Sequence, residues 1–228
     1  MLIKGWLFMG VLSLAAPVQA QNQVPAVVNV SRINASIKVD EGQRAGKLDT
    51  VNGAIHIGAK ARVEEATTVN GSIRVGTAAQ VGSLGAVNGS IQVKAQAKVE
   101  GDIVVVNGSI RLAPGVQVQG QVGNVNGSIV LDGAEVHGEL RTTSGSILLK
   151  NGAVVDGGVL IKAHHSWLAA WFPIFQKKPR VVIGPGSTVR GTLRFERPVA
   201  LYISKQAKVG KIEGAKAVYF DGTTPSGD

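Results

Sequence analysis

Aliphatic residues recur along most of this chain with a period of about eighteen residues, and they alternate with polar residues inside each repeat. The clearest repeat is the pentapeptide Val-Asn-Gly-Ser-Ile, which first occurs at residues 69–73 and last at residues 125–129. The third residues of this motif and of its variants are 18 or 19 positions apart: Ala35, Gly53, Gly71, Gly89, Gly108, Gly127 and Gly145. A fixed period of this length predicts a solenoid in which each repeat forms one coil.

A second repeat, of the form Ala-x-Val-x-Gly, lies half a coil away from the first. Its central residues are Ala45, Val63, Val81, Val99, Val118, Val136, Val155, Val189 and Val209. These positions predict about nine coils. With neighbouring strands about 4.8 Å apart, the stack is expected to be about 40 Å long.

An aliphatic residue also recurs at every sixth position through the first four coils, at Val51, Ile57, Val63, Val69, Val75, Val81, Val87, Val93, Val99 and Val105. Three such steps make one coil, so the pattern predicts an all-β, single-domain, three-sided parallel β-helix. Each side is expected to hold one short strand with an inward aliphatic residue at each step. The glycine and asparagine of the pentapeptide are expected at corners, because both tolerate positive φ.

The asparagines of the pentapeptide fall in one column. Its members are Asn34, Asn52, Asn70, Asn88, Asn107 and Asn126. Stacked side-chain amides can hydrogen-bond along such a column, as they do in cross-β stacks. A structural ladder is therefore favoured over a metal or sugar site along the same corner.

The first twenty residues have the pattern of a secretory signal. Lys4 precedes an apolar run over residues 6–16, and small residues lead to a cleavage site after Ala20. The apolar run is too short to span a bilayer as a helix, and no later run is expected to form a transmembrane span in the mature chain. We expect a signal peptide (1–20), an N-terminal linker or cap (21–30), the β-helix (31–216) and a flexible tail (217–228), in a protein exported to the periplasm or cell surface.

An insertion interrupts the second repeat, whose step between Val155 and Val189 is 34 residues instead of 18 or 19. One coil plus about fifteen residues accounts for this step, and places the insertion at residues 163–180. Aromatic residues four positions apart, such as Trp167 and Trp171, predict a short helix there. Ser166 is its candidate N-cap, and Pro173 marks its end.

Charge and aromatic residues both concentrate after residue 150. Residues 150–216 hold twelve Lys and Arg against three acids, whereas residues 21–149 hold eleven against ten. Aromatic rings beside cations suit an anionic surface, such as lipid, lipopolysaccharide or a glycan, without specific nucleic-acid recognition. The candidate binding residues are Trp167, Trp171, Phe172, Phe175, Lys177, Lys178, Arg180, Arg190 and Arg194. In the alternative interpretation, the insertion is only a cap over the solenoid.

Catalytic, cofactor and metal sites are not expected. Acidic residues are scattered and form no column on the eighteen-residue period, His56 and His137 are isolated in the sequence, and His164 and His165 are adjacent instead of spaced as ligands. No phosphate-binding loop motif occurs. A polysaccharide-active β-helix enzyme remains the alternative, and it would need a carboxylate cluster that only the fold brings together.

The pentapeptide column and the Gly-x-(Val/Ile) column resemble the repeats of bactofilin-type polymer-forming proteins and of exported adhesin-type β-solenoid domains. The resemblance covers about residues 30–212 and implies a parallel β-helix without a cofactor, in a scaffolding or surface role. The signal peptide and the aromatic insertion depart from the bactofilin pattern and favour a role in the envelope over a cytoskeletal one. We therefore expect a non-enzymatic envelope protein that acts as a structural or adhesin-like module. Homo-oligomers, or a self-polymerising scaffold, would arise by end-to-end stacking.

Overall fold

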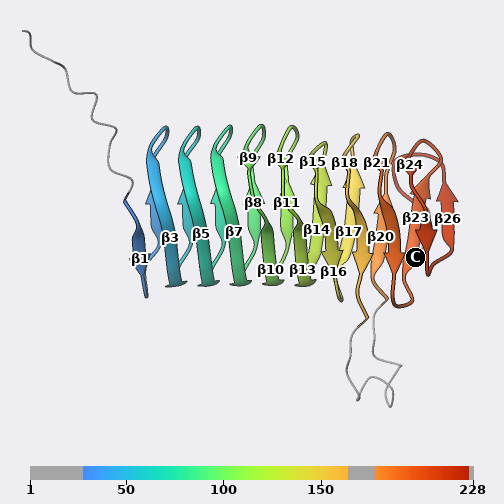
Figure 1. Cartoon of the computed structure of the whole chain (residues 1–228), viewed down its shortest axis with the longest axis horizontal. Coiled ribbons are helices and arrows are strands. Elements are labelled where there is room, and N and C mark those ends of the chain that lie inside the picture. Colours follow the sequence, from blue (N-terminus) through green and yellow to red (C-terminus); the bar gives the residue numbers. More distant parts are fainter. Residues whose placement is uncertain (1–27, 164–177, 226–228) are drawn as a thin grey trace, which may run out of the picture.

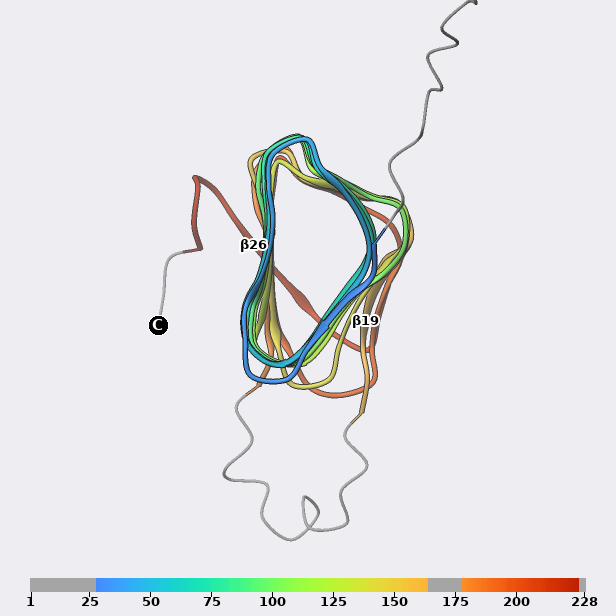
Figure 2. The same ribbon diagram turned by 90° about the vertical axis from the view of Figure 1, so that its left-hand side faces the viewer.

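The protein is a parallel β-solenoid, seen in a computed structural model that describes residues 28–163 and 178–225. Successive coils lie side by side along one axis (Figure 1) and superimpose into one closed outline when viewed along it (Figure 2). The described residues contain strands and turns but no helix, and therefore none that could cross a bilayer. The helix predicted over the insertion falls on residues outside this description. The all-β solenoid predicted by the repeats is confirmed.

One side of every coil belongs to a ten-stranded parallel sheet. Its strands, in spatial order, are β2 (Ile37–Val39), β4 (Ile55–Ile57), β6 (Ile73–Val75), β8 (Ile91–Val93), β11 (Ile110–Leu112), β14 (Ser128–Asp132), β17 (Ser146–Lys150), β20 (Arg180–Ile183), β23 (Ala200–Ser204) and β26 (Ala217–Phe220). The count of ten coils exceeds the nine predicted. The tenth coil contributes β26, which follows the last copy of the second repeat and was expected to be flexible tail.

The other two sides form one sixteen-stranded sheet that bends around a corner. In the first coils, long strands run through this corner without a break: β3 (Arg44–Asn52), β5 (Arg62–Asn70) and β7 (Gln80–Asn88). Later coils replace each long strand by two short ones. The second side then holds β9 (Lys98–Val99), β12 (Gln117–Val118), β15 (Glu135–Val136), β18 (Val154–Val155), β21 (Thr188–Val189) and β24 (Lys208–Val209). The third side holds β1 (Val30–Arg32), β10 (Ile103–Asn107), β13 (Val122–Asn126), β16 (Glu139–Thr142), β19 (Gly158–Ile161), β22 (Thr192–Phe195) and β25 (Ile212–Glu213).

The break in the long strands comes from one extra residue at the corner. Val81 pairs with Val99, eighteen residues on, but Leu84 pairs with Ile103, nineteen residues on. The additional residue lies between Val99 and Ile103, so the ladder is interrupted there, as at a β-bulge. The nineteen-residue steps of the sequence repeat therefore have a local structural cause.

The six-residue pattern gives the inward face correctly on two sides, and on the third side it is correct only at Val105. Ile73 and Val75 are buried with Arg74 exposed between them, as alternation requires. Val51, Val69 and Val87 were expected to point inward, but they are exposed. Their predecessors, such as Thr50 and Thr68, are buried instead, because the long strands take a three-residue step between inward positions at the bend.

The asparagine column forms a continuous ladder of side-chain hydrogen bonds. Each amide Nδ2 donates to the Oδ1 of the asparagine in the preceding coil, from Asn52 to Asn34 at one end and from Asn126 to Asn107 at the other. The donor–acceptor distances along the column lie between 2.8 and 3.1 Å. The ladder therefore joins six successive coils along the corner between the third side and the ten-stranded sheet.

An Asn88→Ala substitution is expected to lower the free energy of unfolding by about 1–2 kcal/mol, because Asn88 both donates to Asn70 and accepts from Asn107. Asn126→Ala removes only the bond to Asn107, since the next coil carries Ser144 at this position, and should cost about half as much. Urea denaturation of the two variants measures the difference. Equal losses would contradict a cooperative amide ladder.

Glycine is required in the pentapeptide because the backbones of neighbouring coils approach each other closely there. The reason expected from the sequence, positive φ, is wrong for the first three of these glycines. Gly53, Gly71 and Gly89 do not have positive φ. A Cβ on Gly89 would lie 1.7 Å from the carbonyl oxygen of Gly71, and one on Gly71 would lie 1.9 Å from that of Gly53. Each coil is therefore packed against the next at a point where no side chain fits.

Candidate functional site

The predicted binding residues of the insertion fall partly outside the described chain. Trp167, Trp171, Phe172, Phe175 and Lys177 all belong to residues 164–177, for which the structure gives no placement. Ile147 of β17 pairs with Val181 of β20, 34 residues further on, which confirms that one coil plus an insertion separates these two strands.

The described basic residues of the predicted site lie on three different sides of the solenoid. Arg180 begins β20 in the ten-stranded sheet, Arg190 follows β21 on the second side, and Arg194 lies in β22 on the third. Lys178, which is exposed, precedes Arg180 by two residues. A coil takes the chain around the whole perimeter in about twenty residues, so closeness in sequence does not place these cations on one face.

Acidic neighbours on adjacent strands engage much of this positive charge. Arg194 Nε lies 3.0 Å from Glu213 Oε2, and Lys211 Nζ lies 2.8 Å from the other oxygen of the same carboxylate. The hydrogen bonds from Lys211 and Arg194 hold the pKa of Glu213 below its ordinary value. Arg180 lies over the ring of Tyr202, 5.0 Å from its centroid, as in a cation–π contact. Part of the positive charge of this region is therefore engaged by local contacts.

On the second side, the pairing of neighbouring coils brings Asp156 close to Glu135 and His137. Val136 points into the core from β15, so the residues before and after it, Glu135 and His137, both point outward. β18 pairs with β15 in register, and the amide of Asp156 donates to the carbonyl oxygen of Val136 at 2.9 Å. This pairing places Asp156 beside His137 on the outer surface.

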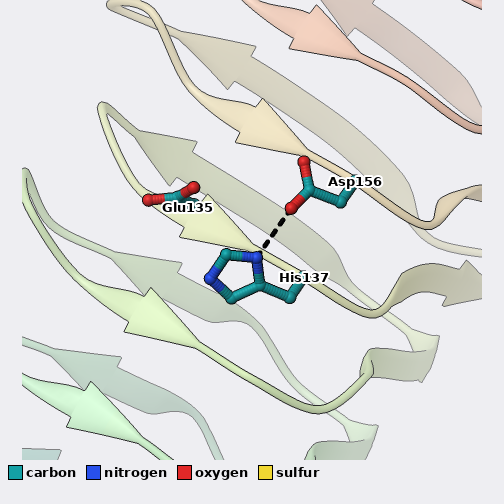
Figure 3. A group of neighbouring side chains, drawn as sticks. All are labelled: Glu135, His137 and Asp156. Atoms are coloured by element: carbon teal, nitrogen blue, oxygen red, sulfur yellow. Dashed lines mark hydrogen bonds and ion pairs between the residues drawn. The ribbon is translucent and has the colours of Figure 1, made fainter.

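Figure 3 shows His137 and Asp156 in direct contact, with Glu135 beside them. His137 Nδ1 lies 2.6 Å from Asp156 Oδ2, and Arg190 from the following coil donates to the other oxygen, Oδ1. The hydrogen bond from His137 and the charge of Arg190 lower the pKa of Asp156. One ligand atom from each of Glu135, His137 and Asp156 lies within 4.8 Å of the other two. An imidazole and two carboxylates at this spacing can hold a cation or transfer a proton.

The expectation that His137 is isolated is therefore wrong. Asp156 follows His137 by nineteen residues, the same step that separates Val136 from Val155 in the second repeat. Applying that step to every histidine would have identified the pair. The same procedure finds a different neighbour for His56, whose Nε2 lies 3.1 Å from Nη1 of Arg74 in the next coil.

A column of exposed valines forms a second surface feature, on the third side beside the asparagine ladder. Val51, Val69, Val87 and Val125 are between 38 and 41 % exposed. A shallow, mainly apolar depression extends across this side in the first coils, next to Val104. The outward valines continue the pentapeptide repeat, so the motif shapes the surface as well as the corner.

Comparison of the chain with models of protein families, with curated proteins and with solved structures finds no match to any of them.

Proposed function

We propose that this chain is a non-enzymatic, exported protein of the bacterial cell envelope whose solenoid acts as a rigid spacer or assembly module. The observation that carries the proposal is the unbroken parallel pairing from β2 to β26 along one side. Ten strands about 4.8 Å apart give a rod about 43 Å long. Export and the envelope location rest on the first twenty residues, which have the pattern of a secretory signal, and on the resemblance to adhesin-type solenoids.

The outer surface supports a structural role because its polar groups join neighbouring coils. Asparagine amides pair along one corner, Lys150 contacts Asp132 of the preceding coil at 2.9 Å, and Arg194 contacts Glu213 of the next. Hydrogen bonds from Lys150 and Asn151 lower the pKa of Asp132. These carboxylates face basic partners, whereas a glycan-active enzyme needs carboxylates that face a substrate.

We further propose that the segment around residues 177–180 attaches the rod to an anionic envelope component. Among the described cations of the predicted site, Arg190 and Arg194 form ion pairs with Asp156 and Glu213, and Arg180 lies over Tyr202, so the exposed Lys178 best fits an anionic surface. Attachment at one edge of one side would orient the long axis relative to the membrane or glycan layer. Sedimentation with vesicles of each kind distinguishes lipid from lipopolysaccharide as this component.

Replacing Lys177, Lys178 and Arg180 by glutamate is expected to abolish salt-sensitive binding to anionic vesicles. The chain is expressed with its first twenty residues in a bacterial host, and export predicts a periplasmic species that begins at Gln21 by mass. This species is then sedimented with vesicles of neutral lipid, anionic lipid or lipopolysaccharide, at low and high salt.

A matched control reverses three exposed cations elsewhere, Lys94, Lys98 and Arg111, with the same change of net charge. Circular dichroism confirms the fold of both variants. Equal binding of the two triple variants, or no binding by the parent chain, would reject attachment through residues 177–180. Retention of the full-length chain in the cytoplasm would reject the envelope role itself.

A further inference from the structure

The group formed by Glu135, His137 and Asp156 has the composition of a transition-metal site. We propose that these residues bind a divalent transition-metal ion, with Zn²⁺ the favoured ion, across two adjacent coils. The three ligand atoms lie within 4.8 Å of one another, and ions of this kind bind nitrogen and oxygen at about 2.0–2.2 Å. Binding requires side-chain rotations that separate His137 Nδ1 from Asp156 Oδ2, which lie 2.6 Å apart, and that arrange the three atoms around one ion.

The ligand set favours zinc over calcium or magnesium. Imidazole nitrogen suits Zn²⁺, Cu²⁺ and Ni²⁺, whereas Ca²⁺ and Mg²⁺ prefer oxygen ligands in larger number. Two carboxylates and one neutral imidazole offset the charge of a divalent ion, and Arg190 adds one positive charge beside Asp156. The three protein ligands leave a coordination position open, because the side chains of His137 and Asp156 are 36 and 25 % exposed and face solvent.

The backbone holds the ligands in place without any ion. Glu135 lies in β15 and His137 directly follows that strand, and the hydrogen bond from the Asp156 amide to the Val136 carbonyl fixes the adjacent coil against them. Arg190 contacts Oδ1 of Asp156 and leaves Oδ2 directed at His137. In metal sites, a neighbouring group usually hydrogen-bonds to one oxygen of a coordinating carboxylate and so orients the other oxygen toward the ion.

The consequence of binding is a cross-link between the coils that contain β15 and β18. In a solenoid each coil contacts only its neighbours, so a metal bridge strengthens one interface of the stack directly. This inference does not depend on the envelope role, and it holds whether or not the chain binds an anionic surface.

The test is calorimetric titration of the tag-free mature chain, residues 21–228, with ZnCl₂ and separately with CaCl₂. We expect zinc to bind, calcium not to bind, and His137→Gln to weaken zinc binding at least ten-fold. His56→Gln is the matched control, because it removes a histidine from the ten-stranded sheet and should leave zinc affinity unchanged. A double variant, His164→Gln with His165→Gln, tests the adjacent pair in the insertion.

Three results would overturn the proposal: no zinc binding by the parent chain, equal affinities of the His137→Gln and His56→Gln variants, or loss of binding in the His164/His165 variant alone. Amide NMR of the unmutated chain provides a measurement that does not depend on the folding of any variant. Zinc should shift the resonances of Glu135, His137 and Asp156 selectively. Shifts confined to other residues would also reject the site.

Discussion

A Gly89→Ala substitution is expected to lower the free energy of unfolding by at least about 3 kcal/mol. The new Cβ would lie 1.7 Å from the carbonyl oxygen of Gly71, and its next-nearest contact, the Gly71 carbonyl carbon, would be only 2.6 Å away. Both atoms belong to backbone, so no side-chain rotation can relieve the clash. The coils on either side of Gly89 must move apart at a corner where their amides otherwise pair.

Gly85→Ala is the control for this prediction, because it changes the same residue type in the same coil. A Cβ at Gly85 would make only an ordinary contact, 3.4 Å from Cγ2 of Thr67. Its effect on stability is expected to stay within about 0.5 kcal/mol. Chemical denaturation of both variants gives the comparison, and similar losses in the two would contradict close backbone approach as the reason for the glycine column.

The sequence repeat predicts where the column of pentapeptide glycines lies, but it does not predict why glycine is required there. Positive φ is concentrated at a different corner, the one between the ten-stranded sheet and the second side, where Lys60, Ala78 and Gln96 adopt it in successive coils. Glycine adopts positive φ at this corner in other coils, at Gly42, Gly115, Gly133, Gly152 and Gly186, so glycine marks the corner in only part of the sequence. At the pentapeptide corner, by contrast, the short distance between stacked backbones selects glycine in each coil from Gly53 to Gly145, and the motif stays recognisable.

The fold class, the register and most of the core could be predicted, because each coil of a solenoid repeats the same pattern of strands and turns. Inward positions such as Val63 and Ile73 follow directly from alternation within a strand. The exposed Val51 and Val69 could not be predicted, because a uniform six-residue step assumes identical sides. The bend inside β3 and β5 shifts which residues point inward, and that bend depends on the three-dimensional course of the chain.

The candidate site was harder to predict than the fold, because it depends on which residues the three-dimensional course of the chain brings side by side. His137 and Asp156 are close because two coils pair in register, and only the nineteen-residue step connects them in the sequence. The basic residues show the opposite error. Arg180, Arg190 and Arg194 are near one another in the sequence, yet the coil distributes them over three sides. In a solenoid, residues that are one repeat apart in the sequence lie side by side, whereas residues about ten positions apart lie on different sides of the coil.

An Ile110→Ala substitution is expected to lower the free energy of unfolding by about 2–5 kcal/mol. Ile110 is fully buried in β11 and pairs in register with Ile91 on one side and Ile129 on the other. Alanine removes buried methylene and methyl groups from the middle of this isoleucine column. The narrow core is bounded by hydrogen-bonded backbone on each side, so it can collapse little into the resulting cavity.

Arg111→Ala is the control for this prediction, because Arg111 is the next residue on β11 and points to solvent. Its replacement should change stability by no more than about 0.5 kcal/mol. Each coil contacts only its neighbours, so the loss in Ile110→Ala should appear first in β8, β11 and β14. Hydrogen exchange of their amides measures this directly. Uniformly faster exchange from β2 to β26 would instead mean that the rod unfolds as one cooperative unit, in which a local defect is shared by all ten coils.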